Sequence, residues 1–480
     1  MTVDLVVVGS GEAAQSVAYA CREAGWSVTV VDSDPFGGTC SLRGCDPKKV
    51  LVGVSELVDW TRRMLGKGIS SPVPTLVWPE MIRFKHTFVD GVPASNEESF
   101  TEAGIRAIQG RAQFVGPASL RVGDETLAGR HVVIATGARH APLAIPGEQY
   151  LTTSTQFLDL DQLPRRVVFV GGGYIAFEFT HIAAGADAEV SMLHRGDRPL
   201  ERFDADLVAQ LVQITGDLGV DVRVRTTVTA IEKRGNELIV HARGGQGMTE
   251  VAADLVVHAA GRVPEIDDLA LDVAGIERVG GGGVAVNEYL QSVSNPAVYA
   301  AGDAVASGGF PHTPVAGMQG RIVATNLLTA NTRIPNYEGI PTVVFTTPPL
   351  ARVGLDEATA RAQGLSFTTH QEDTSGWYSS RRVALAHSGF KTLVEDGTER
   401  ILGAHLLGIH AEEIVNIFAL AVRAGLSARD LKDMVYAYPT GASDIGYMML
   451  TAARCVRTSR DQWCEVVSRS GIGSADLIMK

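Results

Sequence analysis

The chain has 480 residues, 45% of them hydrophobic and 20% charged, with a formal net charge of −12. This length predicts about three domains, and the acidic balance argues against nucleic acid and anionic membranes as partners because it repels both. The N-terminus lacks a basic n-region, and no stretch approaches the roughly 20 apolar residues that cross a bilayer. With five cysteines, too few for a disulfide scaffold, we expect a cytoplasmic protein.

The N-terminal pattern predicts a strand, a glycine turn, a helix and a second strand that ends at Asp32. These segments are, in chain order, a strand over 3–8, the turn GSGEAA over 9–14, a helix to 24 and a strand over 27–31. A G-x-G-x-x-A turn in this context is typical of a dinucleotide-binding unit. We expect Gly9, Gly11 and Ala14 to shape a pyrophosphate site at the helix N-terminus, and Asp32 to accept hydrogen bonds from a ribose diol.

Two closely spaced cysteines follow, at the start of the next predicted helix, in GGTCSLRGCDPKK over 37–49. Cys40 and Cys45 can form a strained, exchangeable disulfide, and the helix dipole together with Lys48 would lower the pKa of a thiolate there. A structural pair or half of a zinc site is the alternative. No second cysteine or histidine cluster has ligand spacing, so we predict no metal site. Cys21, on the first helix, is expected in the core.

A second strand, glycine turn and helix lie far downstream. They are a strand over 167–170, the turn GGGYIA over 171–176, a helix to 184 and a strand over 189–193, continued by a helix over 202–219 and a strand over 220–228. Gly171, Gly173 and Ala176 therefore predict a second dinucleotide site. Arg195 and Arg198 follow its second strand where an acid would favour NADH, and a basic side chain accommodates a 2′-phosphate. The pattern favours NADPH, with solvated surface arginines as the alternative.

The remainder predicts a return to the first unit and then a separate α+β domain. A strand over 298–300 precedes a helix over 316–328, and from residue 337 the pattern predicts strands over 342–345, 390–394 and 404–407 and an amphipathic helix over 411–424.

Over about residues 1–450 the chain resembles the flavoprotein pyridine nucleotide–disulfide oxidoreductases, the group of glutathione reductase, dihydrolipoamide dehydrogenase and mercuric reductase. The resemblance is carried by both glycine turns, GGTCSLRGCDPKK, ATG at 135–137, YAAGD at 299–303, TPVA from 313 and IPTVVFTTPPLARVGL from 340. It implies an α/β fold with two Rossmann-like dinucleotide-binding domains and a C-terminal α+β dimerisation domain. The implied division is FAD binding over 1–150 and 271–336, NAD(P) binding over 151–270, and dimerisation over 337–480 with a C-terminal extension.

The resemblance also implies cofactors and roles: FAD, NADPH with NADH possible, a small-molecule acceptor, and a homodimer that shares its active site between subunits. Cys45 would be the thiolate facing the flavin and Cys40 the outward interchange thiol. Lys48 and Glu178 would pair beside the flavin, and Tyr174 would be the aromatic gate over it. The other cofactor positions implied are Gly38, Thr39, Lys49, Thr136, Gly137, Gly261, Gly302, Asp303 and Thr313.

One segment departs from the family pattern HPTxxE. Tyr438 occupies the histidine position and Ser443 the glutamate position. A phenol, with an ordinary pKa of about 10, donates a proton or binds a soft metal but is a poor general base near neutrality. Mercuric reductases resemble this chain in their tyrosine, although Cys455 and Cys464 do not match their adjacent C-terminal cysteines. Flavin and dithiol chemistry on quinones, oxygen or a thioether is therefore an alternative function.

His312 is a weaker candidate. It precedes the TPVA segment near the expected flavin ring, where it would either hydrogen-bond or pack as a structural histidine.

Overall fold

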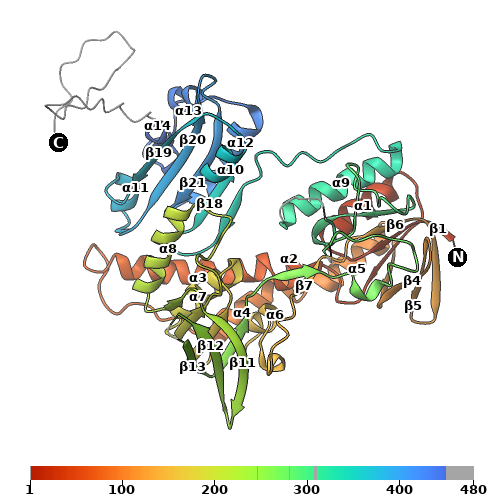
Figure 1. Ribbon diagram of the computed structural model, residues 1–480, viewed down its shortest axis with the longest axis horizontal. Coiled ribbons are helices and arrows are strands. Elements are labelled where there is room, and N and C mark those ends of the chain that lie inside the picture. The colour runs from red at the N-terminus through yellow and green to blue at the C-terminus, as the bar shows by residue number, and fades with distance from the viewer. Residues whose placement is uncertain (1, 246, 281, 307–310, 450–480) are drawn as a thin grey trace. The chain divides into compact units, whose positions relative to one another are not determined.

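The computed structural model describes residues 2–245, 247–280, 282–306 and 311–449, which divide into two compact units (Figure 1). The first contains the described residues up to Glu338 together with Val344–Leu350, and the second contains Gly339–Val343 and the described residues from Ala351 onward. None of the helices within these ranges is long and apolar enough to cross a membrane.

A largely parallel sheet forms the core of the first Rossmann-like part. Its strands run in the order β3-β2-β1-β6-β5-β4, with β16 also paired to β6. The strands are β1 (Thr2–Val8), β2 (Val28–Asp32), β3 (Arg106–Gln109), β4 (Ala112–Gly116), β5 (Ser119–Val122), β6 (Glu125–Ile134) and β16 (Val298–Ala300). Alternate residues of β1 pack on opposite faces, as a strand period of two requires: Leu5 and Val7 in one hydrophobic cluster, Val6 and Val8 in the other.

Helices α1 (Glu12–Glu23) and α9 (Thr313–Thr329) pack side by side on one face of this sheet (Figure 1). Gly320 lies at their contact, where a Cβ atom would come 2.5 Å from the Ala13 carbonyl oxygen. Cys21 is fully buried there, as predicted. Further helices of this part are α2 (Gly38–Arg43), α3 (Cys45–Arg63), α4 (Trp78–Val89) and α5 (Val92–Glu102).

The second Rossmann-like part has a parallel sheet in the order β10-β9-β8-β14. Its elements are β8 (Arg166–Val170), α7 (Tyr174–Gly185), β9 (Glu189–Leu193), α8 (Ala205–Asp217), β10 (Asp221–Arg223) and β14 (Leu255–His258), preceded by α6 (Ser154–Leu158). The strands β7 (Ala138–His140) and β15 (Arg262–Pro264), which pair with each other, connect it to the first part. Residues 171–173 therefore connect the strand to the helix, and residues 174–176 form the first turn of α7.

The single strand predicted over 220–228 is wrong. It is two strands, β10 and β11 (Thr227–Arg234), which belong to different sheets. Arg225 between them has a φ of 50°. The backbone N–H groups of Arg225 and Thr226 donate to the carbonyls of Gly196 and His194. These bonds take the chain out of the parallel ladder, so strand pairing ends at Arg223.

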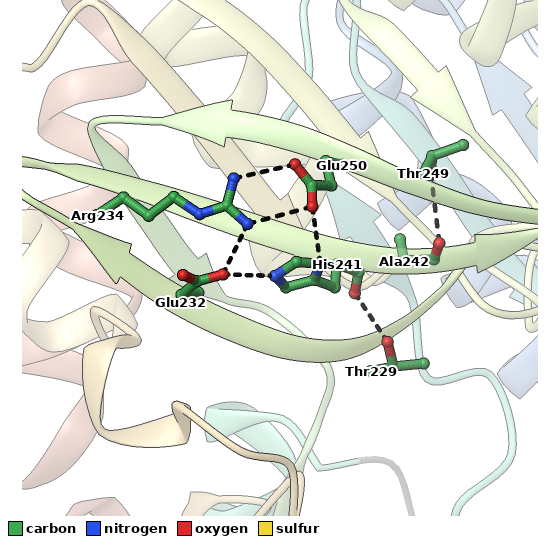
Figure 2. Close-up of polar contacts among 7 residues, drawn as sticks. All are labelled: Thr229, Glu232, Arg234, His241, Ala242, Thr249 and Glu250. Atoms are coloured by element: carbon green, nitrogen blue, oxygen red, sulfur yellow. Dashed lines mark hydrogen bonds and ion pairs between the residues drawn. The ribbon is translucent and has the colours of Figure 1, made fainter.

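An antiparallel sheet of β11, β12 (Glu237–Gly244) and β13 (Gly247–Ala253) follows. Figure 2 shows the charged cluster on it: His241 lies 3.2 Å from Glu232 and 3.5 Å from Glu250, and Arg234 also pairs with both carboxylates. These pairs, all between different strands except Arg234–Glu232 within β11, are partly exposed, so each contributes modestly to sheet stability.

The second unit is α+β, as predicted. Its strands include β18 (Leu350–Gly354), β19 (Phe367–Asp373), β20 (Gly389–Glu395) and β21 (Ile401–Leu407), after β17 (Thr342–Val344) at the unit boundary. Its helices are α10 (Glu357–Ala362), α11 (Tyr378–Arg381), α12 (Ala411–Ala424), α13 (Ala428–Asp433) and α14 (Ile445–Met448). The apolar face of α12 packs on β21 through Ile414, Val415 and Phe418.

Candidate active site

The first glycine turn is closed against two other backbone segments. Gly9 has a φ of 114°, and a Cβ atom on it would come 2.2 Å from the Ala135 carbonyl oxygen. A Cβ atom on Gly38 would come 2.5 Å from the Cα atom of Gly11. Only glycine permits these approaches. The backbone therefore forms a cradle at the N-terminus of α1, as a nucleotide pyrophosphate requires.

Asp32 lies at the end of β2 with a partner that the sequence did not indicate. Its carboxylate accepts hydrogen bonds from the Ser10 hydroxyl at 2.6 Å and from the backbone N–H of Asp34 at 3.0 Å. The Ser10 oxygen in turn accepts from the N–H of Gly37 at 3.1 Å. Burial raises the pKa of Asp32. The side chain of Ser10 thus ties the glycine turn to the carboxylate proposed for the ribose.

Two polar side chains near this cradle fit a bound nucleotide. The Thr136 hydroxyl is buried and has no hydrogen-bond partner within the described residues, so a ligand would satisfy it. Asp303, whose pKa is raised by burial, has the Arg262 guanidinium at 3.8 Å. Arg262 also donates to the Thr39 hydroxyl at 3.4 Å and to the Ala138 carbonyl. Sequence reasoning missed Arg262, although it directly follows Gly261.

The other residues predicted at the FAD site are one buried alanine, Ala14, and three glycines, Gly137, Gly261 and Gly302, that have positive φ angles. Ala14 is fully buried on α1, which lets this helix pack closely on the sheet. Gly302, with a φ of 71°, donates its N–H to the Gln319 side chain at 2.7 Å. Gly137 and Gly261 also have positive φ angles, of 74° and 115°, and nothing within 4 Å of a Cβ position.

The second glycine turn repeats the close approach. A Cβ atom on Gly171 would come 2.0 Å from the Ala259 carbonyl oxygen, whereas Gly173 has no atom within 4 Å of its Cβ position. Ala176 is fully buried. The open side of Gly173, at the N-terminus of α7, fits a second nucleotide pyrophosphate.

The basic residues after β9 differ from one another. Arg195 is exposed, and no hydrogen bond or ion pair of its side chain occurs in the described part of the chain. Arg198 is half-buried and donates to the Glu201 carbonyl at 2.8 Å. Asp197, between them, pairs with Arg225 at 3.1 Å. Among the residues that the structure describes, no carboxylate therefore pairs with Arg195, and its guanidinium is accessible to an anionic group.

The two cysteines flank a break between helices and do not share one helix start, which corrects the sequence prediction. Cys40 is within α2, Cys45 is the first residue of α3, and Gly44 between them has φ −139° and ψ −113°. Both are thiols. A hydrogen bond from Cys40 is the largest cause that lowers the pKa of Cys45, to about 6, followed by Thr313 and then Lys48, with burial opposing. The same bond raises the pKa of Cys40.

Contacts that start at the Cys45 thiol link α3 to α9, and the next turn of α3 is linked to α7. The Thr313 hydroxyl, at the start of α9, lies 3.7 Å from Cys45 Sγ. One turn along α3 from Cys45, Lys48 donates to the Glu178 carboxylate at 2.8 Å, and both side chains are buried. Glu178 lies one turn along α7 from Tyr174. These contacts join the dithiol to the helix that carries the predicted aromatic gate.

Phe345 packs against the lysines of this region. The ammonium groups of Lys48 and Lys49 lie 4.3 and 4.5 Å from its ring centroid, and its backbone N–H donates to Glu178 at 2.9 Å. The Lys49 ammonium also lies 3.5 Å from Glu56. Lys49, predicted as a cofactor contact, is therefore placed beside the Lys48–Glu178 pair.

Comparison with known proteins agrees with this arrangement. Residues 3–320 match the family model described as pyridine nucleotide-disulphide oxidoreductase, and residues 340–449 match the dimerisation domain of that family. The chain belongs to the pyridine nucleotide-disulphide oxidoreductases. As a family member it is a flavoprotein oxidoreductase that uses a pyridine nucleotide, and it carries the family's dimerisation domain.

Several members of the family cover most of this oxidoreductase. Glutathione reductase of Nostoc sp. is 31% identical over 92% of this chain and 98% of its own length. Mercuric reductase of Staphylococcus aureus is 30% identical over 93% and 82%. A solved Cu(II) complex of the HOCl-induced flavoprotein disulfide reductase RclA from Escherichia coli has a TM-score of 0.84, 28% identity, and coverage of 94% and 99%.

In the second unit of this oxidoreductase, the segment that departs from the family pattern is folded without an acid–base dyad. Tyr438 is 79% exposed, and no hydrogen bond of its side chain occurs between described residues. The Ser443 hydroxyl donates to the Thr440 carbonyl at 2.6 Å, and the Thr440 hydroxyl accepts from the Ser443 N–H. Thr440 is the N-cap of a short helical turn, and Ser443 completes the capping box by bonding back to it. Cys455 and Cys464 lie outside the described residues.

Proposed function

We propose that this oxidoreductase is an NADPH-dependent FAD enzyme that passes electrons through Cys40 and Cys45 to a small disulfide, a soft metal ion or another small electrophile. We further propose FAD binding by residues 1–150 and 271–336, NADPH binding by 151–270, and a homodimer that forms through residues 337–480 and shares its active site. At both nucleotide turns a glycine lies too close to a backbone carbonyl to carry a Cβ atom. This close packing supports the proposal, since each turn leaves backbone N–H groups accessible at a helix N-terminus.

The observation that carries the proposal is the environment of the Cys45 thiol. A sulfur whose pKa is lowered to about 6 by the Cys40 thiol, Thr313 and Lys48 is mostly a thiolate at neutral pH. Cys40, whose pKa is raised, keeps its proton until it reacts. The two sulfurs are thus unequal, which supports Cys45 as the resident thiolate and Cys40 as the thiol that meets the acceptor.

The residues that would hold the cofactors are those of the two cradles. Gly9, Gly11 and Thr136 would contact the FAD pyrophosphate, Asp32 its ribose and Asp303 its ribityl chain. A bound FAD would supply two-electron redox chemistry between the nicotinamide hydride and the Cys40–Cys45 disulfide, which this reduction returns to the dithiol. The Lys48–Glu178 pair would place a buried cation beside this exchange and keep its position fixed, because Glu178 is also held by the Phe345 N–H.

The choice of NADPH rests on the second turn. Arg195 is exposed without a carboxylate partner in the described structure, and it follows β9 where an acidic residue would bind a 2′-hydroxyl and repel a 2′-phosphate. Arg198 is the neighbouring candidate. NADH stays possible if Arg195 serves only as a surface charge.

With a disulfide acceptor, the chemistry of the dithiol balances as follows. Cys40 Sγ attacks one acceptor sulfur, and the proton that Cys40 loses passes to the departing sulfur to give the first product thiol. Cys45 then attacks Cys40 Sγ, releases the second product thiol and forms the Cys40–Cys45 disulfide. Two electrons pass to the acceptor, and NADPH with one proton restores the dithiol. A thiophilic metal ion would instead bind both sulfurs before reduction.

Anaerobic titration with NADPH tests the proposal. We expect the flavin spectrum to gain a long-wavelength band from the Cys45 thiolate against oxidised flavin, and we expect NADH to produce it with lower affinity. A Cys45→Ser variant should bind flavin and lack the band. Absence of the band in the wild-type enzyme would exclude the dithiol route. NADPH oxidation with glutathione disulfide, Hg(II), Cu(II) and quinones would then rank the acceptors.

A second candidate function follows from Tyr438 and Ser443. A tyrosine phenol is a poor general base near neutral pH, and the Ser443 hydroxyl donates to the Thr440 carbonyl, so neither provides the base that returns a proton in ordinary disulfide turnover. This arrangement favours a reaction that needs no base at that position, such as quinone or oxygen reduction or thioether cleavage. Full turnover of an acceptor by Cys45→Ser would support it over the dithiol route.

A further inference from the structure

The Tyr174 ring is held between two aromatic side chains from other segments. Its centroid lies 5.6 Å from that of Phe203 at an interplanar angle of 64°, and 5.9 Å from that of His312 at 69°. Both are edge-to-face contacts in the favourable range for aromatic pairs. Tyr174 is the first residue of α7, directly after the open turn at Gly173. The ring is therefore restrained at the entrance to the second nucleotide site.

His312 is well placed to provide this restraint. It precedes α9 with extended backbone (φ −125°, ψ 144°), and its side chain does not cap that helix. Burial first, and the charge of Arg202 second, lower the pKa of His312 to about 4, so the imidazole is neutral at physiological pH. A neutral, half-buried ring packs against a phenol without a charge that would attract it toward solvent.

The next residue connects His312 to the chemistry. Thr313 contacts the Cys45 sulfur at 3.7 Å, while His312 contacts Tyr174. Since the two are adjacent and Thr313 is fixed in the first turn of α9, the position of the His312 ring is determined by the same helix end that contacts the dithiol.

We propose that His312 is a positioning residue that holds the Tyr174 ring in a closed position over the nicotinamide site. A nucleotide with a nicotinamide ring must then break the His312–Tyr174 contact in order to bind, whereas a nucleotide without this ring need not. This inference rests on the proposed function, in which Tyr174 is the gate of the pyridine nucleotide site. A closed gate lowers the apparent affinity by the fraction of open protein. A contact of this kind corresponds to about a two- to tenfold effect.

The test compares two ligands on the oxidised holoenzyme by titration calorimetry: NADP⁺, and adenosine 2′,5′-bisphosphate, which lacks the nicotinamide ring. In His312→Ala we expect the dissociation constant of NADP⁺ to fall about two- to tenfold and that of the bisphosphate to stay unchanged. His312→Leu, which keeps the side-chain volume, should give the same split if the alanine variant is unstable. In a Tyr174→Ala background the His312 substitution should have no further effect.

A matched control is available at His131. Its ring meets Tyr299 edge-to-face at 6.3 Å and 71°, so His131→Leu removes a similar contact away from Tyr174 and should change neither constant. Unchanged NADP⁺ binding in both His312 variants, or equal changes for both ligands, would overturn the inference. If the wild-type protein binds NAD⁺ more tightly than NADP⁺, the proposed preference for NADPH is wrong, but the inference about His312 is not affected. The same comparison can then be made with NAD⁺ and with ADP, which lacks the nicotinamide ring.

Discussion

The Thr313 hydroxyl should set part of the ionised fraction of Cys45 near neutral pH. Hydrogen bonding from Cys40 is the largest cause of the low Cys45 pKa of about 6, and Thr313 is the next that lowers it. Its oxygen lies 3.7 Å from the sulfur and comes from a different helix. Thr313→Val removes this donor and keeps the side-chain shape, so it should raise the pKa of Cys45.

The magnitude follows from the strength of a hydrogen bond to a charged group. At the lower end, about 1.4 kcal/mol, suited to a sulfur acceptor at an exposed position, the pKa rises by about one unit. At pH 6.5 the thiolate fraction then falls from about three quarters to about one quarter, a threefold change. At pH 9 both proteins are almost fully ionised, so the difference disappears.

The assay is the rate of alkylation of Cys45 by iodoacetamide in the reduced, anaerobic holoenzyme, followed by peptide mass spectrometry from pH 5 to 9. Thr313→Ser, which keeps the hydroxyl, should titrate like the wild type. The reasoning is refuted if the Thr313→Val profile overlies the wild-type profile, or if Thr313→Ser shifts as far as Thr313→Val.

Three other predictions concern stability and cofactor retention. Lys48→Met leaves the Glu178 carboxylate, 7% exposed, without its cation. Chemical denaturation should therefore show that the free energy of unfolding falls by about 3–5 kcal/mol, and the double variant Lys48→Met/Glu178→Gln should largely recover it. An equal loss in both variants would contradict the pairing. Burial lowers the pKa of His181 to about 4, below the ordinary value of about 6.5, so the unfolded state binds its proton first. The melting temperature should therefore fall as pH drops from about 6.5 to about 4, with a shallower slope in His181→Gln; identical slopes would argue against it. Gly9→Ala places a methyl group 2.2 Å from a carbonyl oxygen, so the purified variant should lack the yellow colour of bound flavin. Gly53→Ala, where the added methyl group meets no atom within 4 Å, should keep this colour. A yellow Gly9→Ala protein would show that the cradle is not required.

Much of the fold follows from local sequence patterns. The strands over 189–193 and 298–300 and the helix over 411–424 have the predicted bounds. The strands are short apolar segments, and the helix has a clear apolar face that ends before Gly425. The break at Arg225 could not be predicted, since it depends on carbonyls of Gly196 and His194 that another loop provides. The helix α9 begins at Thr313, three residues before the predicted start, because Pro314 is tolerated in a first helical turn.

The sequence by itself determined where the glycine turns, the cysteine pair and the altered tyrosine segment lie, because these are features of neighbouring residues. Tertiary structure alone decided which distant side chains meet. Thr313 reaches Cys45 across 268 positions and Glu178 reaches Lys48 across 130. A local pattern indicates which face of a helix is buried, but the partner of that face depends on how α3, α7 and α9 pack together.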